Sequence, residues 1–139
     1  MTLQTTMTTR PDTDMVLETI RDDFELLCHT REEDNITWTA PVCDLVELIH
    51  TMWARGYLLN IFGRRVLFGR FTEQLCTRLH IVPPKNAYAV INNIHMRKDA
   101  YNTSLITRLG RMIGTQGDRH PLRRFVSSAW NAERKEIND

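Results

Sequence analysis

The sequence predicts a mainly α-helical compact domain of about six helices with one short strand pair. Apolar residues recur at three- and four-residue steps over most of the chain, and residues that start or stop helices flank these runs. Alternating β-forming residues occur in only one short stretch. A chain of 139 residues, 42% of them hydrophobic, is long enough to bury a core of its own.

The expected elements follow from this pattern, and most have a recognisable beginning and end. The expected elements in chain order are a helix at 14–29, a strand at 36–38, a helix from 41 that ends before Gly56, extended pieces within 56–69, and helices at 69–79, 85–98, 105–113 and 121–135. We expect all of them to lie in one helical domain, 14–139, whose last part, 118–139, is the C-terminal helix.

The first helix follows a tail that we expect to be disordered. Residues 1–13 are rich in threonine and poor in aliphatic residues, so they bury too little surface to offset their ordering entropy. From Leu17 to Cys28 the apolar positions keep a helical period, and Thr13 or Asp14 can cap the helix.

The second helix is the most sharply bounded one. Ile36 and Trp38 alternate with polar residues before it, which is typical of a short strand, and Trp38 is expected to anchor that strand to the helices. Pro41 suits the first helical turn, where it loses no useful N–H group. Gly56 is expected to take the left-handed conformation that ends the helix.

The second half of the chain contains four more expected helices, separated by turn residues. The segment 56–69 is apolar without a clean period, and we expect one extended piece of it to pair with 36–38. Pro83 and Pro84 stop the helix before them. Asn102, Thr103 and Ser104 form a capping triplet for the next helix, and Gly114, Gly117 and Pro121 mark a linker.

Composition favours a protein of the cytoplasm that makes no disulfides. The three cysteines are far apart and lie beside aliphatic residues, which suits small core residues in a reducing compartment. No window approaches the ~20 apolar residues of a membrane span, and the N-terminus lacks an apolar signal region. We therefore expect no membrane partner.

The motifs of common enzyme classes are missing, and we expect no catalytic residues, no cofactor and no metal. The chain contains neither GxSxG nor the phosphate-binding GxxxxGK[ST] pattern. Its five histidines show no HxxxH spacing, and its cysteines show no CxxC spacing.

Charge is distributed unevenly along the chain. Residues 1–70 carry a net charge of −4 and residues 71–139 a net charge of +5. Eight Lys or Arg residues lie within 85–124, against Asp99 and Asp118. Such a basic half attracts a polyanion or an acidic partner, or pairs with the acidic half of its own chain, and the sequence leaves these alternatives open.

One group of basic residues suggests a nucleic-acid interface. Arg108 and Arg111 are three apart and off the apolar stripe of their helix, so we expect them to be exposed together. Two helices joined by a brief turn, with basic residues beside the junction, are compatible with helix-turn-helix docking on phosphates. The candidate DNA-binding residues are Lys85, Arg97, Lys98, Arg108 and Arg111.

The sequence also resembles a known family. The runs ITWT, DLVELIHTMWARG, FTEQL and NNIHMRKDAYNTSLITRL are similar to the C-terminal domain of the RteC family, regulators associated with excision of conjugative transposons. The likeness covers about residues 36–113. The matching positions are Trp38, Thr39, Leu45, Glu47, Leu48, Ile49, Gly56, Phe71, Glu73, Ile94, Arg97, Lys98 and Leu105.

The resemblance implies a winged-helix-like domain that binds double-stranded DNA upstream of excision genes. On that basis the chain is expected to be a transcription regulator of a conjugative transposon or another mobile element. The alternative is a non-enzymatic protein-interaction or dimerisation module, whose acidic first helix meets the basic surface of a partner. That partner would be a second copy of the chain, in a homodimer, or another protein.

Overall fold

A computed structural model describes residues 13–96 and 104–127 of the protein. The described part contains five α-helices and two short 3-10 helices. They are α2 (Thr13–Cys28), η1 (Glu32–Asp34), α3 (Val42–Ala54), α4 (Phe68–Arg78), α5 (Ala87–His95), α7 (Leu105–Gln116) and η2 (Pro121–Phe125).

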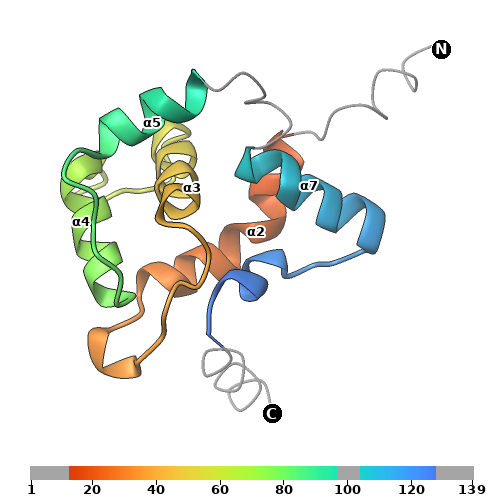
Figure 1. Cartoon of the computed structure of the whole chain (residues 1–139), viewed down its shortest axis with the longest axis horizontal. Coiled ribbons are helices and arrows are strands. Elements are labelled where there is room, and N and C mark those ends of the chain that lie inside the picture. The colour runs from red at the N-terminus through yellow and green to blue at the C-terminus, as the bar shows by residue number, and fades with distance from the viewer. Residues whose placement is uncertain (1–12, 97–103, 128–139) are drawn as a thin grey trace.

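The helices form two groups joined across α3 (Figure 1). Helices α3, α4 and α5 pack on one another and are called the α3–α4–α5 group. Helix α2 packs on α7 and η2, which also contact each other, and these are called the α2–α7–η2 group. Contacts between α3 and α7 connect the two groups, and the buried apolar residues form one continuous cluster.

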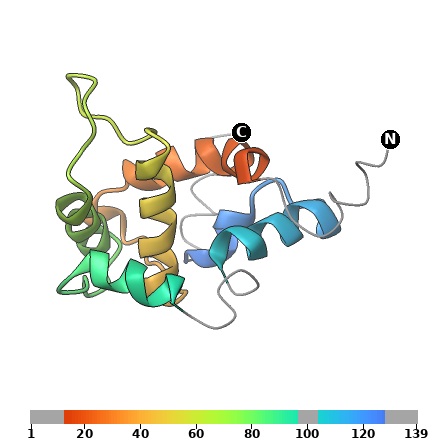
Figure 2. The ribbon, with the colours of Figure 1, turned by 90° about the horizontal axis from the view of Figure 1, so that it is seen from above.

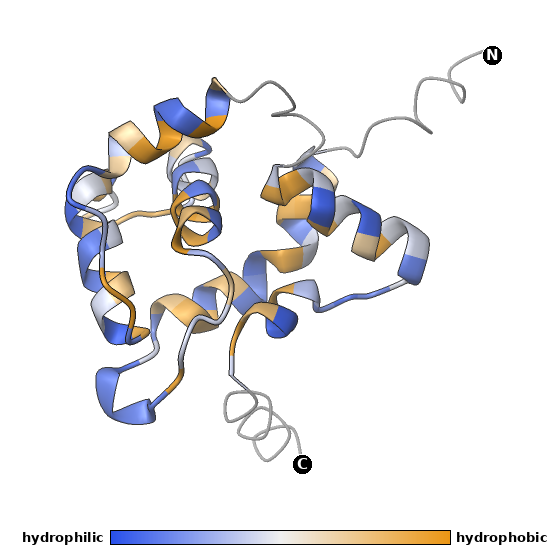
Figure 3. Cartoon of the chain, viewed as in Figure 1, coloured by the Kyte–Doolittle hydropathy of each residue, from blue (hydrophilic) through white to orange (hydrophobic). Residues whose placement is uncertain are grey.

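The amphipathic patterns of the sequence correspond to these packing faces. In Figure 3 hydrophobic and hydrophilic residues alternate around α2 and α7. The apolar positions Leu17, Ile20 and Leu27 of α2 are buried, as are Leu105 and Leu109 of α7. Burial of these faces excludes apolar surface from water and is the main source of stability for such short helices.

The expected end of the second helix is confirmed, whereas its beginning lies one residue later than expected. Pro41 precedes the first helical residue of α3, and its fixed φ of −57° suits this position. Gly56 has a φ of +79°, a conformation that side chains with a Cβ atom rarely adopt, so it ends the helix as predicted.

The segment around Trp38 joins the two groups. Trp38 forms an isolated antiparallel bridge with Val126, and its backbone N–H donates to the carbonyl of Leu79 at 3.3 Å. Its indole is 2% exposed, stacks on Phe125 with ring centroids 5.6 Å apart, and donates through Nε1 to the Pro41 carbonyl at 3.0 Å. Trp38 is therefore a packing anchor, as the sequence predicts.

The predicted strand pair does not form among the described residues. Residue 38 pairs with Val126 instead of with 56–69, and each of the two β-bridges is isolated. The apolar alternation at 36–38 marks a buried extended segment, but it holds no information about a partner so far along the chain.

The prediction of the last α-helix is wrong for the beginning of that helix. Residues Pro121–Phe125 form a 3-10 helix and Val126 is extended, because Val126 pairs with Trp38 and Ser127 N–H donates to the Thr37 carbonyl at 2.9 Å. The rest of that prediction, and residues 1–12 of the predicted tail, lie outside the described residues. Thr13 already belongs to α2.

A short hairpin at 57–66 connects α3 to α4. Leu59 and Arg65 form its bridge, and Val66 N–H donates to the Leu58 carbonyl at 3.1 Å. The hairpin projects away from the helices, on the side of α3 and α4 opposite to α5 (Figure 2). The helices of the described ranges include none long and apolar enough to span a bilayer.

Candidate nucleic-acid interface

Helix α5 presents a polar face without acidic residues. Asn86 caps its beginning, because the side-chain oxygen accepts the N–H of Ala89 at 3.1 Å. Ala87, Ile91 and Ile94 are buried toward the core. The exposed positions of the helix are Tyr88, Ala89, Asn92, Asn93 and His95. This face exposes side-chain amides that can form hydrogen bonds, and it carries no acidic side chain.

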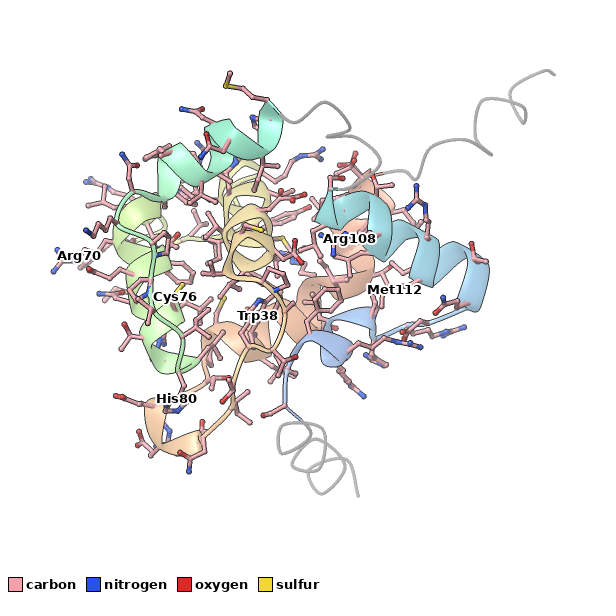
Figure 4. The ribbon with its side chains drawn as sticks, in the orientation of Figure 1. Trp38, Arg70, Cys76, His80, Arg108 and Met112 are labelled. Carbon is pink, nitrogen blue, oxygen red and sulfur yellow. The ribbon has the colours of Figure 1, made fainter. Side chains whose placement is uncertain are left out.

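Two cations lie beside the beginning of α5. Arg70 on α4 and Lys85 on the α4–α5 connection are both exposed, and neither forms an ion pair with the described carboxylates. They line one hollow of about 260 Å³ between α4 and α5, which Glu73 also lines. Figure 4 shows Arg70 pointing outward from α4.

The structure places Arg108 in a different role from the predicted one. Its guanidinium forms two hydrogen bonds with Asp44 of α3, Nη1 to Oδ2 at 3.1 Å and Nη2 to Oδ1 at 2.5 Å. The Asp44 side chain is only 4% exposed, whereas that of Arg108 is 38% exposed. In Figure 4 Arg108 points from α7 toward α3. The prediction that Arg108 is freely exposed beside Arg111 is therefore wrong.

A second carboxylate of α3 acts on the same helix. Glu47 Oε2 accepts the N–H of Leu105 at 2.8 Å and also interacts with the N–H of Ile106. Burial raises the pKa of the Glu47 carboxyl, although the two N–H groups oppose that shift. Together Asp44 and Glu47 place negative charge at the beginning of α7, where the helix dipole favours it.

Sequence reasoning missed Asp44 and Glu47. Both lie on the otherwise apolar helix α3, and both are less than 9% exposed. Two acidic residues three apart among buried positions are a usable signal, because buried carboxylates need hydrogen-bond donors or cations. The hydrogen bond with Asp44 also raises the pKa of Arg108.

The five predicted site residues are not brought together in the described structure. Lys85 lies next to α4, whereas Arg108 and Arg111 lie on α7, on the other side of α3 (Figure 1). Arg111 is exposed. Arg97 and Lys98 lie outside the described residues.

Trp53 and the thiols of Cys28 and Cys76 belong to the core more than to a site. The indole Nε1 of Trp53 donates to the Val66 carbonyl at 2.8 Å. Burial raises the pKa of Cys28 to about 12 and that of Cys76 to about 11, so both thiols stay protonated at neutral pH. Within residues 13–96 and 104–127, histidines, cysteines and carboxylates do not gather into a group that could hold a metal.

Comparisons with family models, with curated proteins and with solved structures yield no match to this chain.

Proposed function

We propose that this protein binds double-stranded DNA, with α4 and α5 as a helix-turn-helix pair and α5 as the recognition helix. The observation that carries the proposal is the acid-free polar face of α5 beside two unpaired cations, Arg70 and Lys85. In helix-turn-helix proteins the second helix lies in the major groove, where its exposed side chains contact base edges.

The chemistry of the α5 face fits both parts of such an interface. Arg70 and Lys85 supply positive charge for phosphates, and binding there releases counterions. The exposed amides of Asn92 and Asn93 can pair with base edges, since an asparagine amide forms two hydrogen bonds with adenine. Arg97 and Lys98, which follow α5 in the sequence, stay candidates for further phosphate contacts.

The family resemblance supports a more specific role. The similarity to RteC regulators covers the sequence from the segment before α3 to α7, so the α3–α4–α5 group lies inside it. On this basis we propose a transcription regulator of a conjugative transposon or another mobile element, in the cytoplasm. A winged-helix fold is part of this proposal. The described residues contain only isolated β-bridges and no strand pair that would form the wing.

The test compares cations that differ only in their position on the surface. We expect Arg70→Gln and Lys85→Gln to weaken binding to a generic duplex, measured by fluorescence anisotropy at two salt concentrations. Each lost phosphate contact should reduce the slope of log affinity against log salt by about 0.9. Arg119→Gln is the matched control, because Arg119 is also exposed and lies between α7 and η2.

Base recognition is tested separately. The double variant Asn92→Ala/Asn93→Ala should lose about 1–3 kcal/mol of discrimination per contacted base on a duplex selected by the wild-type protein, with an unchanged salt slope. Two results would contradict the proposal. One is an equal loss of duplex affinity in Arg70→Gln and Arg119→Gln, and the other is a wild type that does not bind DNA even at low salt.

The alternative function is a protein-interaction or dimerisation module. Its specific support is the hairpin 57–66, which exposes large apolar side chains. An interface with an apolar core depends less on salt than phosphate contacts do, so the same titrations separate the two functions.

A further inference from the structure

The hollow between α4 and α5 contains hydrogen-bond donors that the described structure leaves unused. It lies where α5 begins, against α4 (Figure 1). Its volume is about 260 Å³. A water molecule occupies about 30 Å³ of the liquid, so the hollow has room for a group of several oxygen atoms.

Thr72 of α4 lines this hollow and has an unusual hydroxyl group. The residue is 1% exposed, and its Oγ1 has no hydrogen-bond partner in the described structure. The hydroxyls of Thr19, Thr51 and Thr77 each donate to the carbonyl four residues earlier in their own helices. The Thr72 hydroxyl does not form this bond with Phe68. A buried hydroxyl without a partner costs free energy, which a ligand that accepts its hydrogen would recover.

Two backbone N–H groups in the first turn of α5 also lack an acceptor. Those of Ala87 and Tyr88 bind no other described residue, whereas that of Ala89 donates to the Asn86 side chain at 3.1 Å. Ala87 and Tyr88 both line the hollow. The first N–H groups of a helix have no acceptor within it, and the helix dipole places partial positive charge there. These donors favour a ligand that accepts hydrogen bonds and carries negative charge.

The side-chain charges that line the hollow also favour an anion. Arg70 and Lys85 supply two positive charges and Glu73 one negative charge, which leaves a net charge of +1. All three side chains are exposed, and none forms an ion pair with another described residue. A phosphate group presents three strong acceptor oxygens that point in different directions, so it can bind cations, N–H groups and a hydroxyl together.

We propose that the beginning of α5 is a binding site for one phosphate group. The Thr72 hydroxyl and the N–H groups of Ala87 and Tyr88 donate to its oxygens, and Arg70 and Lys85 neutralise its charge. Because the Thr72 oxygen is closed off from solvent, the phosphate group reaches it only by entering the hollow.

The phosphate group can belong to the backbone of a DNA duplex or to a free phosphate ester. Arg70 and Lys85 are shared with the proposed DNA interface. A single phosphate group can nevertheless bind in the hollow whether or not the protein binds DNA, so the inference does not depend on that function.

Inorganic phosphate is the probe for this site, and the backbone amide signals of Ala87 and Tyr88 report where it binds. In two-dimensional NMR spectra of the full chain, both signals should shift and saturate as phosphate is added. Sodium chloride of the same ionic strength should not shift them in this way, because chloride cannot accept all these hydrogen bonds at once.

Substitutions of Thr72 test the role of its hydroxyl. Thr72→Val keeps the shape of the side chain and should weaken phosphate binding about tenfold, as expected for one hydrogen bond to a charged group. Thr72→Ser retains a hydroxyl and should bind phosphate like the wild type. Thr77→Val is the matched control, because the Thr77 hydroxyl is on the same helix but donates to the Glu73 carbonyl at 2.9 Å.

Thermal unfolding separates a binding role of Thr72 from a structural one. In buffer without phosphate, Thr72→Val should unfold at no lower temperature than the wild type, because it removes a buried hydroxyl that has no partner. Added phosphate should raise the unfolding temperature of the wild type more than that of the variant, since a ligand stabilises the state that binds it.

Glu73 provides a test of opposite sign. Glu73→Gln should strengthen phosphate binding by up to about fivefold, because it removes the one carboxylate among the described residues that line the hollow. Arg70→Gln and Lys85→Gln should each weaken phosphate binding by a similar factor. A site for a cation would give the reverse result in all three variants.

Titration with a generic duplex identifies the source of the phosphate group. If the group belongs to the DNA backbone, Thr72→Val should also weaken duplex binding about tenfold, with an unchanged salt slope because a hydroxyl carries no charge. If the ligand is a free phosphate ester, Thr72→Val should weaken the binding of inorganic phosphate alone. A wild type that binds phosphate but no duplex would contradict the proposed DNA binding and support the site.

Two results would overturn the inference. One is that the amide signals of Ala87 and Tyr88 respond to phosphate no more than to chloride, and the other is that Thr72→Val binds phosphate as tightly as the wild type. Duplex binding that persists in either case would leave the proposed DNA interface intact.

Discussion

Two sets of cations, one from each helix group of this protein, are used differently. In the α2–α7–η2 group Arg108, Arg123 and Arg124 each lie within 4.0 Å of a carboxylate oxygen. In the α3–α4–α5 group and its connections, Arg70 and Lys85 are exposed and have no such partner. The first set stabilises the packing of helices, whereas the second is available to a ligand.

This difference teaches that the role of a cation depends on the nearest carboxylate and not on its spacing along a helix. Arg108 and Arg70 are both arginines outside the apolar stripe of an amphipathic helix. Asp44 is buried and must be paired, because an unpaired buried carboxylate costs several kcal/mol. Arg108 supplies that pair, and no buried carboxylate makes the same demand on Arg70.

The largest expected effect comes from removing the joint between the two groups. Trp38→Ala should lower the free energy of unfolding by about 3–5 kcal/mol, since it leaves a cavity beside Phe125 and Val126. Urea unfolding measures this loss. Trp38→Phe retains most of the packing and should cost clearly less, so similar losses in both variants would show that the hydrogen bond to Pro41 dominates.

An intermediate effect compares the same substitution in the two groups. Arg108→Gln should destabilise the protein by about 2–3 kcal/mol, less than for a fully buried pair because Arg108 keeps some contact with water. Arg70→Gln should change stability by no more than about 0.5 kcal/mol, as exposed substitutions usually do. Thermal unfolding of both variants measures the contrast, and equal effects would remove the distinction between the two groups.

The smallest expected effect concerns how the free energy of unfolding depends on pH. Burial raises the pKa of Glu47 above 4.5, so the folded state holds this proton more tightly than the unfolded state does. The stability gained in this way is full below pH 4.5 and is lost as pH rises through the raised pKa.

Glu47→Gln tests this effect, because the amide oxygen can still accept the N–H of Leu105 but does not titrate. The stability of the wild type relative to the variant should fall as pH rises from about 4 to about 7. Urea unfolding at several pH values measures the difference. A difference that stays constant over this range would show that Glu47 titrates alike in the folded and unfolded states.

Sequence analysis predicts most of the helices, because their signals are local. Pro41 and Gly56 limit helices through their own backbone preferences, and apolar periodicity identifies the buried faces. The pairing of Trp38 with Val126 has no local signal, because 88 residues separate the two. The start of the last helix was mistaken for the same reason, since this distant pairing overrides its helical period.

The candidate site is less predictable than the fold. Lys85 is a candidate from the sequence alone, because its charge and its place before a helix are visible there. The pairing of Arg108 with Asp44 was not predictable, because Asp44 lies 64 residues earlier. Arg70 was missed because it ends the half of the chain, 1–70, that carries a net charge of −4, and only the packing of α4 against α5 brings it beside Lys85.

The first backbone N–H of α7 is bound by a residue of α3, so this hydrogen bond breaks when the two helices separate. The N–H of Leu105 donates to Glu47, which lies 58 residues earlier, and not to a neighbour on its own helix. Local fraying at a helix end normally lets such an amide exchange its hydrogen with solvent quickly. Here exchange requires α7 to separate from α3, so the deuterium uptake of this one amide reports the opening of the joint between the two helix groups.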